Sequence, residues 1–388
     1  MKTRIIGVSH SRFGKLDDSL EALIADSARD ALADAGVDAR DIDAIYVGQF
    51  NSGMCPQEFP ASLALQTDPE LRFKPATRCE NACASGSAAL YQGINLIEGG
   101  LAKRVLVIGA EKMTDASPTA IAEGLLGASY RPESQGVEAG FAGIFAQVAR
   151  AYFERYGDHT DSLARIAAKN HANGVHNPLA QLRKDLGVDF CRDVSDKNPV
   201  VAAPLKRTDC SPVSDGAAAI VLSHPDAAPT SQRQVRFRAR AQVTDFMPLA
   251  RRDLTHLEGA GRAWKQVLES AGLTLDELSL AEVHDCFTIA ELMIYEAMGL
   301  TPLGQGARAI NEGWVMPDGK LPVNPSGGLK SKGHPVGATG VSMHVLAARQ
   351  LLGEATGVQI PDARLAAVFN MGGMGVASYA SVLERTIG

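Results

Sequence analysis

The chain has 388 residues with a formal net charge of −6, and 45% of its residues are hydrophobic and 21% charged. This length favours two domains or two similar halves, and the composition is typical of a globular protein. The acidic balance and few aromatics argue against a nucleic-acid surface. No apolar run approaches the ~20 residues of a membrane span, and no secretory signal follows Met1. We therefore expect a cytoplasmic protein that binds neither nucleic acid nor membrane.

Six cysteines are present, and none forms a CxxC pair or a Cys/His spacing typical of zinc. We expect them to be reduced thiols in a chain of this length, and we predict no metal site. They are Cys55, Cys79, Cys83, Cys191, Cys210 and Cys286.

The first part of the chain predicts strands and helices in alternation. Ser19 is a suitable N-cap for a helix over 19–35, and Gly36 ends it. A continuous apolar run at 104–109 is typical of a strand buried on both faces. Further strands are expected at 4–8 and 42–48, and further helices at 61–65 and 83–97.

Residues 112–208 have a different sequence pattern, with glycine and proline turns, polar helices over 145–155 and 161–171, and no strong strand signal. We interpret this stretch as an inserted domain or lid. The core resumes with strands at 215–222 and 235–243.

The second part repeats the order of elements. Helices are expected at 261–271, 288–298 and 334–352, and strands at 280–283, 365–370 and 376–383. Such a repeat predicts two copies of one α/β layer unit related by an approximate two-fold axis, here residues 1–245 and 246–388. Helices 83–97 and 334–352 then meet at the axis, and Cys83 and His334 both lie at helix starts near the junction.

The stretch Asn81-Ala82-Cys83-Ala84-Ser85-Gly86-Ser87 places one cysteine and several small residues at the start of an apolar helix. Free N–H groups and the helix dipole at such a position favour a thiolate over a thiol. The small residues allow another element, or a thioester, to approach closely. The alternative is that Cys83 is a buried small hydrophobe, the usual role of a free cysteine.

Three further stretches carry polar chemistry: His284-Asp285-Cys286-Phe287, the glycine-rich loop 324–340 with His334, and Asn370-Met371-Gly372-Gly373-Met374-Gly375. Each alone has an ordinary explanation, since a buried histidine or cysteine is usually part of the core and a glycine-rich turn can simply join strands. The loop matches neither the Walker pattern nor the dinucleotide fingerprint.

Together the four stretches make a chemical set. A nucleophilic Cys83 needs a base, which His334 can supply, and carbon–carbon chemistry at a thioester needs a second acid/base, for which Cys286 is a candidate. Two oxyanion holes are also required. His284 and His334 can form one, and backbone N–H groups of Cys83 and of the Gly372-Gly373 turn can form the other.

The order Cys-Ala-Ser-Gly, His-Asp-Cys-Phe, Gly-His-Pro and a Gly-Gly turn before the last strand resembles the thiolases over essentially the whole chain. It looks most like the branch associated with sterol carrier protein. The resemblance implies an α/β thiolase-like fold of two α-β-α halves in five layers. It implies that Cys83 takes up the acyl group, that His334 activates it, and that His284 stands where many thiolases have an asparagine.

One departure concerns the last glycine turn. Many thiolases have Cys-x-Gly-Gly-Gly there, and this chain has Asn370, which cannot shuttle a proton, and Met374 in place of the third glycine. Cys286 then has to be the second acid/base.

The resemblance also implies coenzyme A and acyl-CoA as substrates, no prosthetic group, and a homodimer or homotetramer. Arg183, Lys184, Lys206 and Arg207 are candidates for the nucleotide phosphates, although a solvated basic face is the other reading for each. Thr244 and Ser326 are further candidate contacts.

We therefore expect an acyl-CoA C-acyltransferase that performs thiolysis of 3-oxoacyl-CoA or Claisen condensation through an acyl-Cys83 intermediate. One alternative is acyl transfer from Cys83 to a non-CoA carbon nucleophile such as a phenolic ring. Another is a non-catalytic scaffold that binds CoA thioesters.

Overall fold

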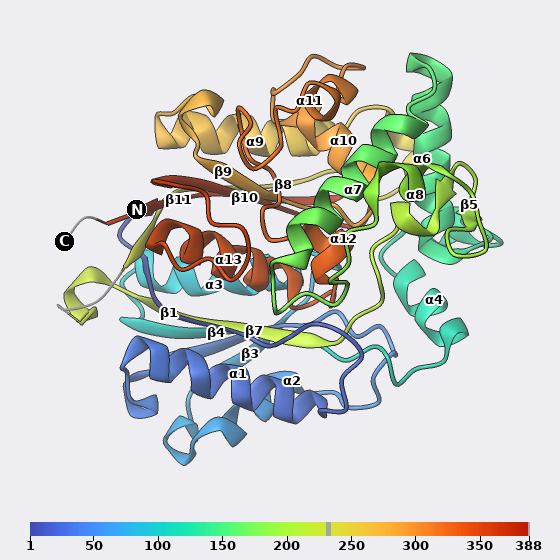
Figure 1. Ribbon diagram of the computed structural model, residues 1–388. Helices are drawn as coiled ribbons and strands as arrows, with labels where there is room; N and C mark the ends of the chain where they lie inside the picture. Colours follow the sequence, from blue (N-terminus) through green and yellow to red (C-terminus); the bar gives the residue numbers. More distant parts are fainter. Residues whose placement is uncertain (230–233, 387–388) are drawn as a thin grey trace.

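The computed structural model describes residues 1–229 and 234–386, and its main elements form five layers (Figure 1). Two sheets enclose a central helical layer, and further helices cover the outer face of each sheet. This confirms the layered thiolase-like α/β architecture predicted from the sequence. Among the described residues, no helix is long and apolar enough to span a bilayer.

The layers are built from elements far apart in the chain. The first outer layer holds helices α1 (Leu20–Ala35) and α2 (Pro60–Leu63), and the sheet beneath it holds strands β3 (Ala76–Cys79), β2 (Ala44–Gly48), β4 (Arg104–Glu111), β7 (Gly216–Ser223) and β1 (Arg4–His10). The central layer holds helices α3 (Ser85–Glu98) and α13 (Thr339–Leu352). The second sheet holds strands β8 (Val235–Thr244), β11 (Ala377–Arg385), β10 (Leu365–Gly372) and β9 (Leu280–Val283), and helices α9 (Glu258–Ala271) and α10 (Thr288–Ala297) cover its outer face.

The segment between β4 and β7 lies at one end of the layers, on the right in Figure 1. It carries a short antiparallel hairpin that the sequence did not predict. Its elements are α4 (Pro118–Leu126), α5 (Arg131–Ser134), α6 (Gly140–Tyr156), α7 (Thr160–Val175), α8 (Gly187–Arg192), β5 (Val200–Ala202) and β6 (Leu205–Lys206). Two short helices, α11 (Ala307–Asn311) and α12 (Gly328–Lys332), lie between α10 and α13.

The two sheets have the same strand order. Hydrogen bonds join the strands as β3-β2-β4-β7-β1-β8-β11-β10-β9. The step from β1 to β8 pairs Arg4 with Arg236 and Ile5 with Val235, so the sheets meet at one edge. Strands β8, β9, β10 and β11 thus occupy in the second sheet the places of β1, β2, β4 and β7 in the first. This is the repeat expected from the order of elements.

The pairing of strand β8 is relevant to where the first half of the chain ends and the second begins. The sequence placed it in a first half ending at residue 245, but β8 pairs with β11 from Val235 to Thr244. By position β8 is the first strand of the second repeat, as β1 is of the first. We propose that the halves divide between β7 and β8, because strand pairing and not sequence spacing defines a sheet.

Local signals placed most elements within a few residues. Ser19 caps α1 by accepting a hydrogen bond from the Ala22 N–H at 3.1 Å, and Gly36 ends it with φ of 59°. Both central helices begin later than predicted, α3 at Ser85 and α13 at Thr339. The four-residue strand β3 was missed because it is too short to show a pattern.

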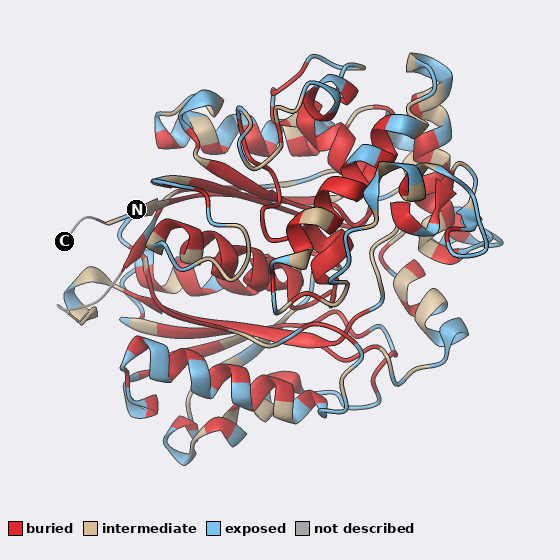
Figure 2. Cartoon of the chain, viewed as in Figure 1, coloured by how far each residue is buried: buried red, intermediate tan, exposed pale blue. Residues whose placement is uncertain are grey.

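The small residues of α3 are explained by packing. A Cβ on Gly86 would lie 2.7 Å from the Gly337 carbonyl oxygen and 2.9 Å from the Val341 nitrogen, and a Cβ on Gly48 would lie 2.6 Å from the Gly86 Cα. Figure 2 shows both central helices as almost wholly buried, whereas the outer helices α1 and α9 expose one face. These glycines therefore let α3 approach β2 and the loop before α13, as expected if small residues near Cys83 allow another element to approach closely.

Candidate active site

Cys83, His284 and His334 come from three separate segments and meet at one point. Cys83 precedes α3, His284 follows β9, and His334 lies between α12 and α13. The cysteine sulfur and a ring nitrogen of each histidine all lie within 4.8 Å of one another, and all three residues are buried. The two rings meet edge to face, with centroids 5.1 Å apart.

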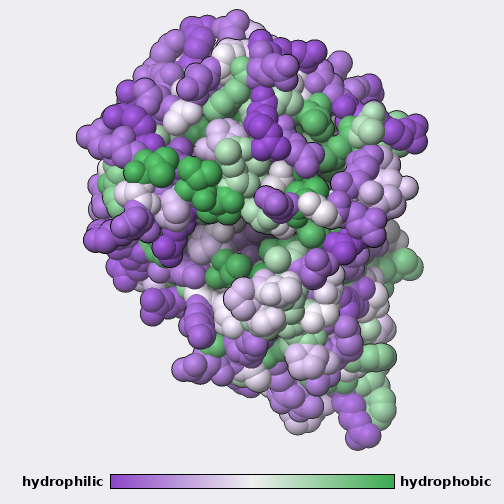
Figure 3. All heavy atoms as spheres, turned by 90° about the vertical axis from the view of Figure 1, so that its right-hand side faces the viewer, coloured by the Kyte–Doolittle hydropathy of each residue, from purple (hydrophilic) through white to green (hydrophobic). Residues whose placement is uncertain are grey.

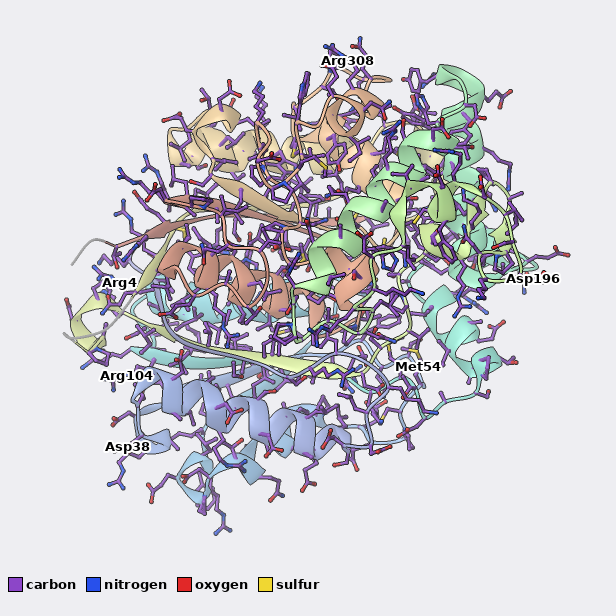
Figure 4. All side chains as sticks on the ribbon, in the orientation of Figure 1. Arg4, Asp38, Met54, Arg104, Asp196 and Arg308 are labelled. Carbon is purple, nitrogen blue, oxygen red and sulfur yellow. The ribbon has the colours of Figure 1, made fainter. Side chains whose placement is uncertain are left out.

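A small apolar cluster surrounds the cysteine. Met54, from the loop before α2, belongs to it and is labelled in Figure 4 on the side of the molecule where α4 lies. The face that carries α4, α6 and α8 is hollowed near its middle, with hydrophobic residues beside the hollow (Figure 3). The buried members of the cluster are Phe50, Met54, Cys83, Met113, Ala128 and Val336.

Burial favours the protonated Cys83 thiol over the thiolate expected at a helix start. Burial raises its pKa to about 12, and N–H groups of Gly373 and of Cys83 itself lower it only in part. Cys83 also lies two residues before the first residue of α3. The preceding Ala82 has φ of 50°, in the left-handed region that is strained for a residue other than glycine. Cys83 therefore needs a base to take its proton.

His334 is arranged as that base. The Thr339 hydroxyl donates to the Pro335 carbonyl at 2.9 Å, so its oxygen accepts from His334 Nδ1–H at 2.6 Å. This leaves the lone pair on Nε2. Burial, followed by the charge of Lys332, lowers the pKa of His334 to about 3, so the ring is neutral and its Nε2 lone pair is free.

His284 has the opposite tautomer, and Asn370 fixes it. One amide atom of Asn370 lies 3.1 Å from the Cys83 carbonyl oxygen, which can only accept, so that atom is Nδ2. The same NH₂ group donates to His284 Nδ1 at 2.9 Å, while Ser87 donates to Asn370 Oδ1 at 2.7 Å. His284 Nε2 therefore carries the proton, and it is buried without a hydrogen-bond partner among residues 1–229 and 234–386. A donor in this state is available for a negatively charged oxygen.

Family models fit both halves of the chain. The model described as "Thiolase, N-terminal domain" matches residues 3–226, and "Thiolase C-terminal domain-like" matches residues 241–385. The chain belongs to the thiolase family. As a member it is a thiolase-type acyltransferase, and its curated relatives include both acetyl-CoA acetyltransferases and sterol carrier protein 2, the branch indicated by the sequence motifs.

The relatives match this thiolase over nearly its whole length. An acetyl-CoA acetyltransferase of Methanothermobacter thermautotrophicus is 36% identical, covering 98% of this chain and 99% of its own. Human sterol carrier protein 2 is 32% identical, covering 95% of this chain and 69% of its own.

Two solved structures share the fold. The Ltp2-ChsH2(DUF35) aldolase has a TM-score of 0.84 at 20% identity, over 99% of this chain and 98% of its own. The Acat5 thiolase from Ascaris suum in complex with coenzyme A has a TM-score of 0.73 at 15% identity, over the full length of both chains. At these identities the likeness concerns the fold alone.

Cys286 lies beside this group. It is buried, and its sulfur does not belong to the described cluster of Cys83, His284 and His334. Burial raises the pKa of its thiol well above the ordinary value, and the charges of Cys83 and Asp285 raise it further. A thiolate formed there is therefore a strong base.

The two glycines of the Gly372-Gly373 turn, predicted as a source of backbone donors, have different roles. The backbone group that lowers the pKa of Cys83 belongs to Gly373, not to Gly372. Gly372 is a paired residue of β10, and a Cβ there would lie 2.3 Å from the Asn81 carbonyl oxygen. Gly372 therefore permits close approach, while Gly373 is the donor.

A buried carboxylate joins the His-Asp-Cys-Phe stretch to the glycine-rich loop. Asp285 accepts from the N–H groups of Leu329 at 2.6 Å and Lys330 at 3.1 Å, and from Asn170 at 2.8 Å. A Cβ on Gly328 would lie 2.2 Å from Asp285 Oδ2. The aspartate between the histidine and the cysteine thus holds the loop that leads to His334.

The candidate coenzyme A contacts divide into exposed and buried residues. Arg183, Lys184, Arg207 and Thr244 are exposed. Lys206 is buried, and its ammonium lies 3.1 Å from the Asp209 carboxylate. Ser326 is buried and donates to Glu282 at 2.7 Å. Because these two groups are already satisfied inside the protein, we assign them a structural role.

Two functional positions were missed from the sequence. Asn370 was considered only as a residue that cannot shuttle a proton, and Thr339 was not considered as a site residue. Neither gives a sequence signal, because their roles depend on contacts with Cys83, His284 and His334 that the fold creates.

Proposed function

We propose that this thiolase is an acyl-CoA C-acyltransferase in which Cys83 carries the acyl group. The observation that supports this most directly is the pair of opposite tautomers beside the cysteine. His334 presents a lone pair at Nε2, and His284 presents a proton at Nε2. A nucleophile, its base and an oxyanion donor are the parts that acyl transfer requires.

In the first step, Cys83 attacks the thioester carbonyl of an acyl-CoA. His334 Nε2 accepts the thiol proton as the sulfur–carbon bond forms. The oxyanion lies toward N–H groups at the site, from His284 Nε2 or from the backbone of Cys83 and Gly373. The bond to coenzyme A then breaks, and His334 passes its proton to the departing thiolate, which leaves as a free thiol. The products are acyl-Cys83 and coenzyme A.

In the second step, the Cys286 thiol gives its proton to His334 Nε2, and the thiolate so formed takes a proton from the α-carbon of another acyl-CoA. That carbon attacks acyl-Cys83, the bond from the Cys83 sulfur to the acyl carbon breaks, and His334 passes its proton to the Cys83 sulfur. Thiolysis of a 3-oxoacyl-CoA is the same sequence in reverse. The high pKa of Cys286 suits proton abstraction from carbon.

Mass spectrometry after exposure to a panel of acyl-CoAs tests both roles. We expect an acyl adduct on Cys83 and none in Cys83→Ala. Cys286→Ala is expected to form the adduct but to lose condensation and thiolysis. Cys191→Ala is the matched control, since Cys191 packs among alanines of α7. Normal acetoacetyl-CoA cleavage by Cys83→Ala contradicts the proposal, and retained condensation by Cys286→Ala contradicts the role of Cys286.

The two alternatives make different predictions. An enzyme that acylates a non-CoA carbon nucleophile discharges labelled acetyl-Cys83 to a phenolic acceptor but not to acetyl-CoA or coenzyme A. A scaffold forms no acyl adduct at all. Slow alkylation by iodoacetamide at neutral pH does not favour the scaffold, because the raised pKa of Cys83 already predicts it.

Coenzyme A thioesters are proposed as substrates because relatives are named acetyl-CoA acetyltransferase and a thiolase of the same fold was solved with coenzyme A. The homodimer or homotetramer stays a prediction.

A further inference from the structure

Glu111 is a fully buried carboxylate that accepts hydrogen bonds from three backbone N–H groups. It is the last residue of β4. Its Oε1 accepts from the Asn51 N–H at 3.0 Å, and its Oε2 accepts from the Phe50 N–H at 3.0 Å and from the Gly337 N–H at 2.9 Å. Because all three of these partners donate, the arrangement fits an ionised carboxylate.

These N–H groups belong to two segments that flank Cys83. One segment follows β2 and carries Phe50, and the other is the loop between α12 and α13, which carries His334. Phe50 and Val336, one from each segment, lie in the apolar cluster around Cys83. A single carboxylate therefore joins one wall of the site to the loop that carries the proposed base.

The loop that carries His334 packs directly against the ends of β2 and β4. A Cβ on Gly337 would lie 2.5 Å from the Ala110 carbonyl oxygen and 2.7 Å from the Gly48 carbonyl oxygen. Glu111 accepts the Gly337 N–H at this contact. The position of the loop therefore depends on how far the Glu111 side chain reaches.

The negative charge of Glu111 is not balanced by an ion pair among the described residues. The neighbouring Lys112 is paired with Asp215 at 2.9 Å. The charge of Arg78 acts on Glu111, but the Arg78 guanidinium forms its ion pair with Glu58 at 2.7 Å. A buried carboxylate without a partner cation is costly, so its charge is felt strongly by the groups around it.

This charge acts on Cys83 in the direction opposite to that found around most reactive cysteines. Burial is the largest cause of the raised pKa of the Cys83 thiol, and the charge of Glu111 raises this pKa further. Reactive cysteines usually lie near positive charge, which favours the thiolate. The thiolate is the form that alkylating agents and oxidants attack. A negative charge here therefore protects the sulfur until a base takes its proton.

We propose that Glu111 is a positioning residue for acyl transfer: it holds Phe50 and the loop of His334 around Cys83, and its negative charge disfavours a free thiolate there. This rests on the proposed function, because positioning is measured as acylation of Cys83. Two variants separate the reach of the side chain from its charge. Glu111→Asp keeps the carboxylate but is one methylene shorter, whereas Glu111→Gln keeps the length but replaces a charged acceptor with a donating NH₂ group.

Both variants are expected to slow acylation of Cys83 by acetyl-CoA by about 10- to 100-fold, because misplacing a reacting group by about 1 Å can cost about 10²-fold in rate. Alkylation by iodoacetamide at pH 9 measures the charge. Burial raises the pKa of Glu111 to about 7, so its carboxylate is ionised at this pH. Glu111→Gln is expected to alkylate at Cys83 about tenfold faster than Glu111→Asp, because loss of a nearby negative charge raises the thiolate fraction.

Glu58→Gln is the matched control. Glu58 is exposed and accepts from Asn51 Nδ2 at 2.8 Å, so this variant makes the same exchange in the same wall segment. It should keep the wild-type rates of acylation and alkylation. All rates are compared at a temperature where the circular dichroism of each variant matches that of the wild-type protein, and Glu111→Asp alone tests the positioning role if Glu111→Gln does not fold.

Acylation within about threefold of the wild-type rate in both variants overturns the positioning role. Equal alkylation of the two variants overturns the charge effect, because looser packing alone changes the access of iodoacetamide in both. A wild-type protein whose Cys83 takes up no acyl group refutes the proposed function. Faster alkylation of Glu111→Gln than of Glu111→Asp still supports the charge effect in that case, so the two failures are distinguishable.

Discussion

Asn370→Asp tests the arrangement of tautomers on which the proposed chemistry depends. In the wild-type protein, Asn370 Nδ2 donates both to the Cys83 carbonyl at 3.1 Å and to His284 Nδ1 at 2.9 Å. An aspartate in the same place presents an acceptor to both atoms. His284 is then expected to move its proton to Nδ1 and to lose the donor at Nε2.

The expected fall in the acetylation rate follows from the loss of one oxyanion donor, which typically lowers kcat by about 10² to 10³, or roughly 3 to 4 kcal/mol of transition-state stabilisation. Ser87→Ala is the matched control. Ser87 donates to Asn370 Oδ1 at 2.7 Å, so its removal leaves both Nδ2 contacts in place. This variant is expected to lose only about 0.5 to 1.5 kcal/mol of stability, with a correspondingly small change in rate.

Two measurements are needed. The rate of Cys83 acetylation by acetyl-CoA reports the loss of the donor, and nitrogen NMR of isotope-labelled histidine reports which ring atom of His284 is protonated. If Asn370→Asp acetylates Cys83 within about threefold of the wild-type rate, His284 Nε2–H is not an oxyanion donor. If the rate falls but Nε2 stays protonated, the tautomer argument is wrong.

Two further predictions concern stability. Burial lowers the pKa of His344 to about 4, so as the pH falls below about 6.5 the unfolded chain binds a proton that the folded protein does not, and stability is lost. The free energy of unfolding, measured by urea titration, should therefore fall between pH 7 and pH 5. In His344→Gln this fall should be smaller by about 2 kcal/mol. An equal loss in both proteins contradicts this. Lys169 lies 2.6 Å from Glu291 in a buried ion pair, so Lys169→Met should lower the free energy of unfolding by about 3 to 5 kcal/mol. Lys265→Met, at an exposed lysine, is the control and should leave the stability unchanged. A change below about 1 kcal/mol in Lys169→Met refutes the reasoning.

The elements that sequence predicted well carry their signals locally. Helix α1 is bounded by Ser19 and Gly36, which act within one turn of the helix ends. Strand β4 is a continuous apolar run because both of its faces are covered. Helix α13 was extended too far toward its N-terminus, since the small residues before Thr339 show no apolar period that marks where the helix begins.

The same distinction between local signals and long-range contacts applies to the candidate active site. Cys83, His284, Cys286 and His334 were found from the sequence because the motifs around them are unusual in combination. The ionisation of Cys83 was not: position near a helix start predicts a lowered pKa, whereas burial among Phe50, Met113 and other apolar residues raises it to about 12. Burial is set by packing between segments that are remote in sequence.

The family, the two repeated α/β halves and the residues proposed to carry the chemistry were predicted from the sequence, because each depends on residue types in a fixed order along the chain. Contacts between segments that are remote in the chain were needed to assign the free nitrogen of each histidine and the glycine that donates to Cys83. These properties depend on hydrogen bonds such as those of Asn370 with Cys83 and His284, which join atoms nearly three hundred residues apart in one case and eighty-six in the other.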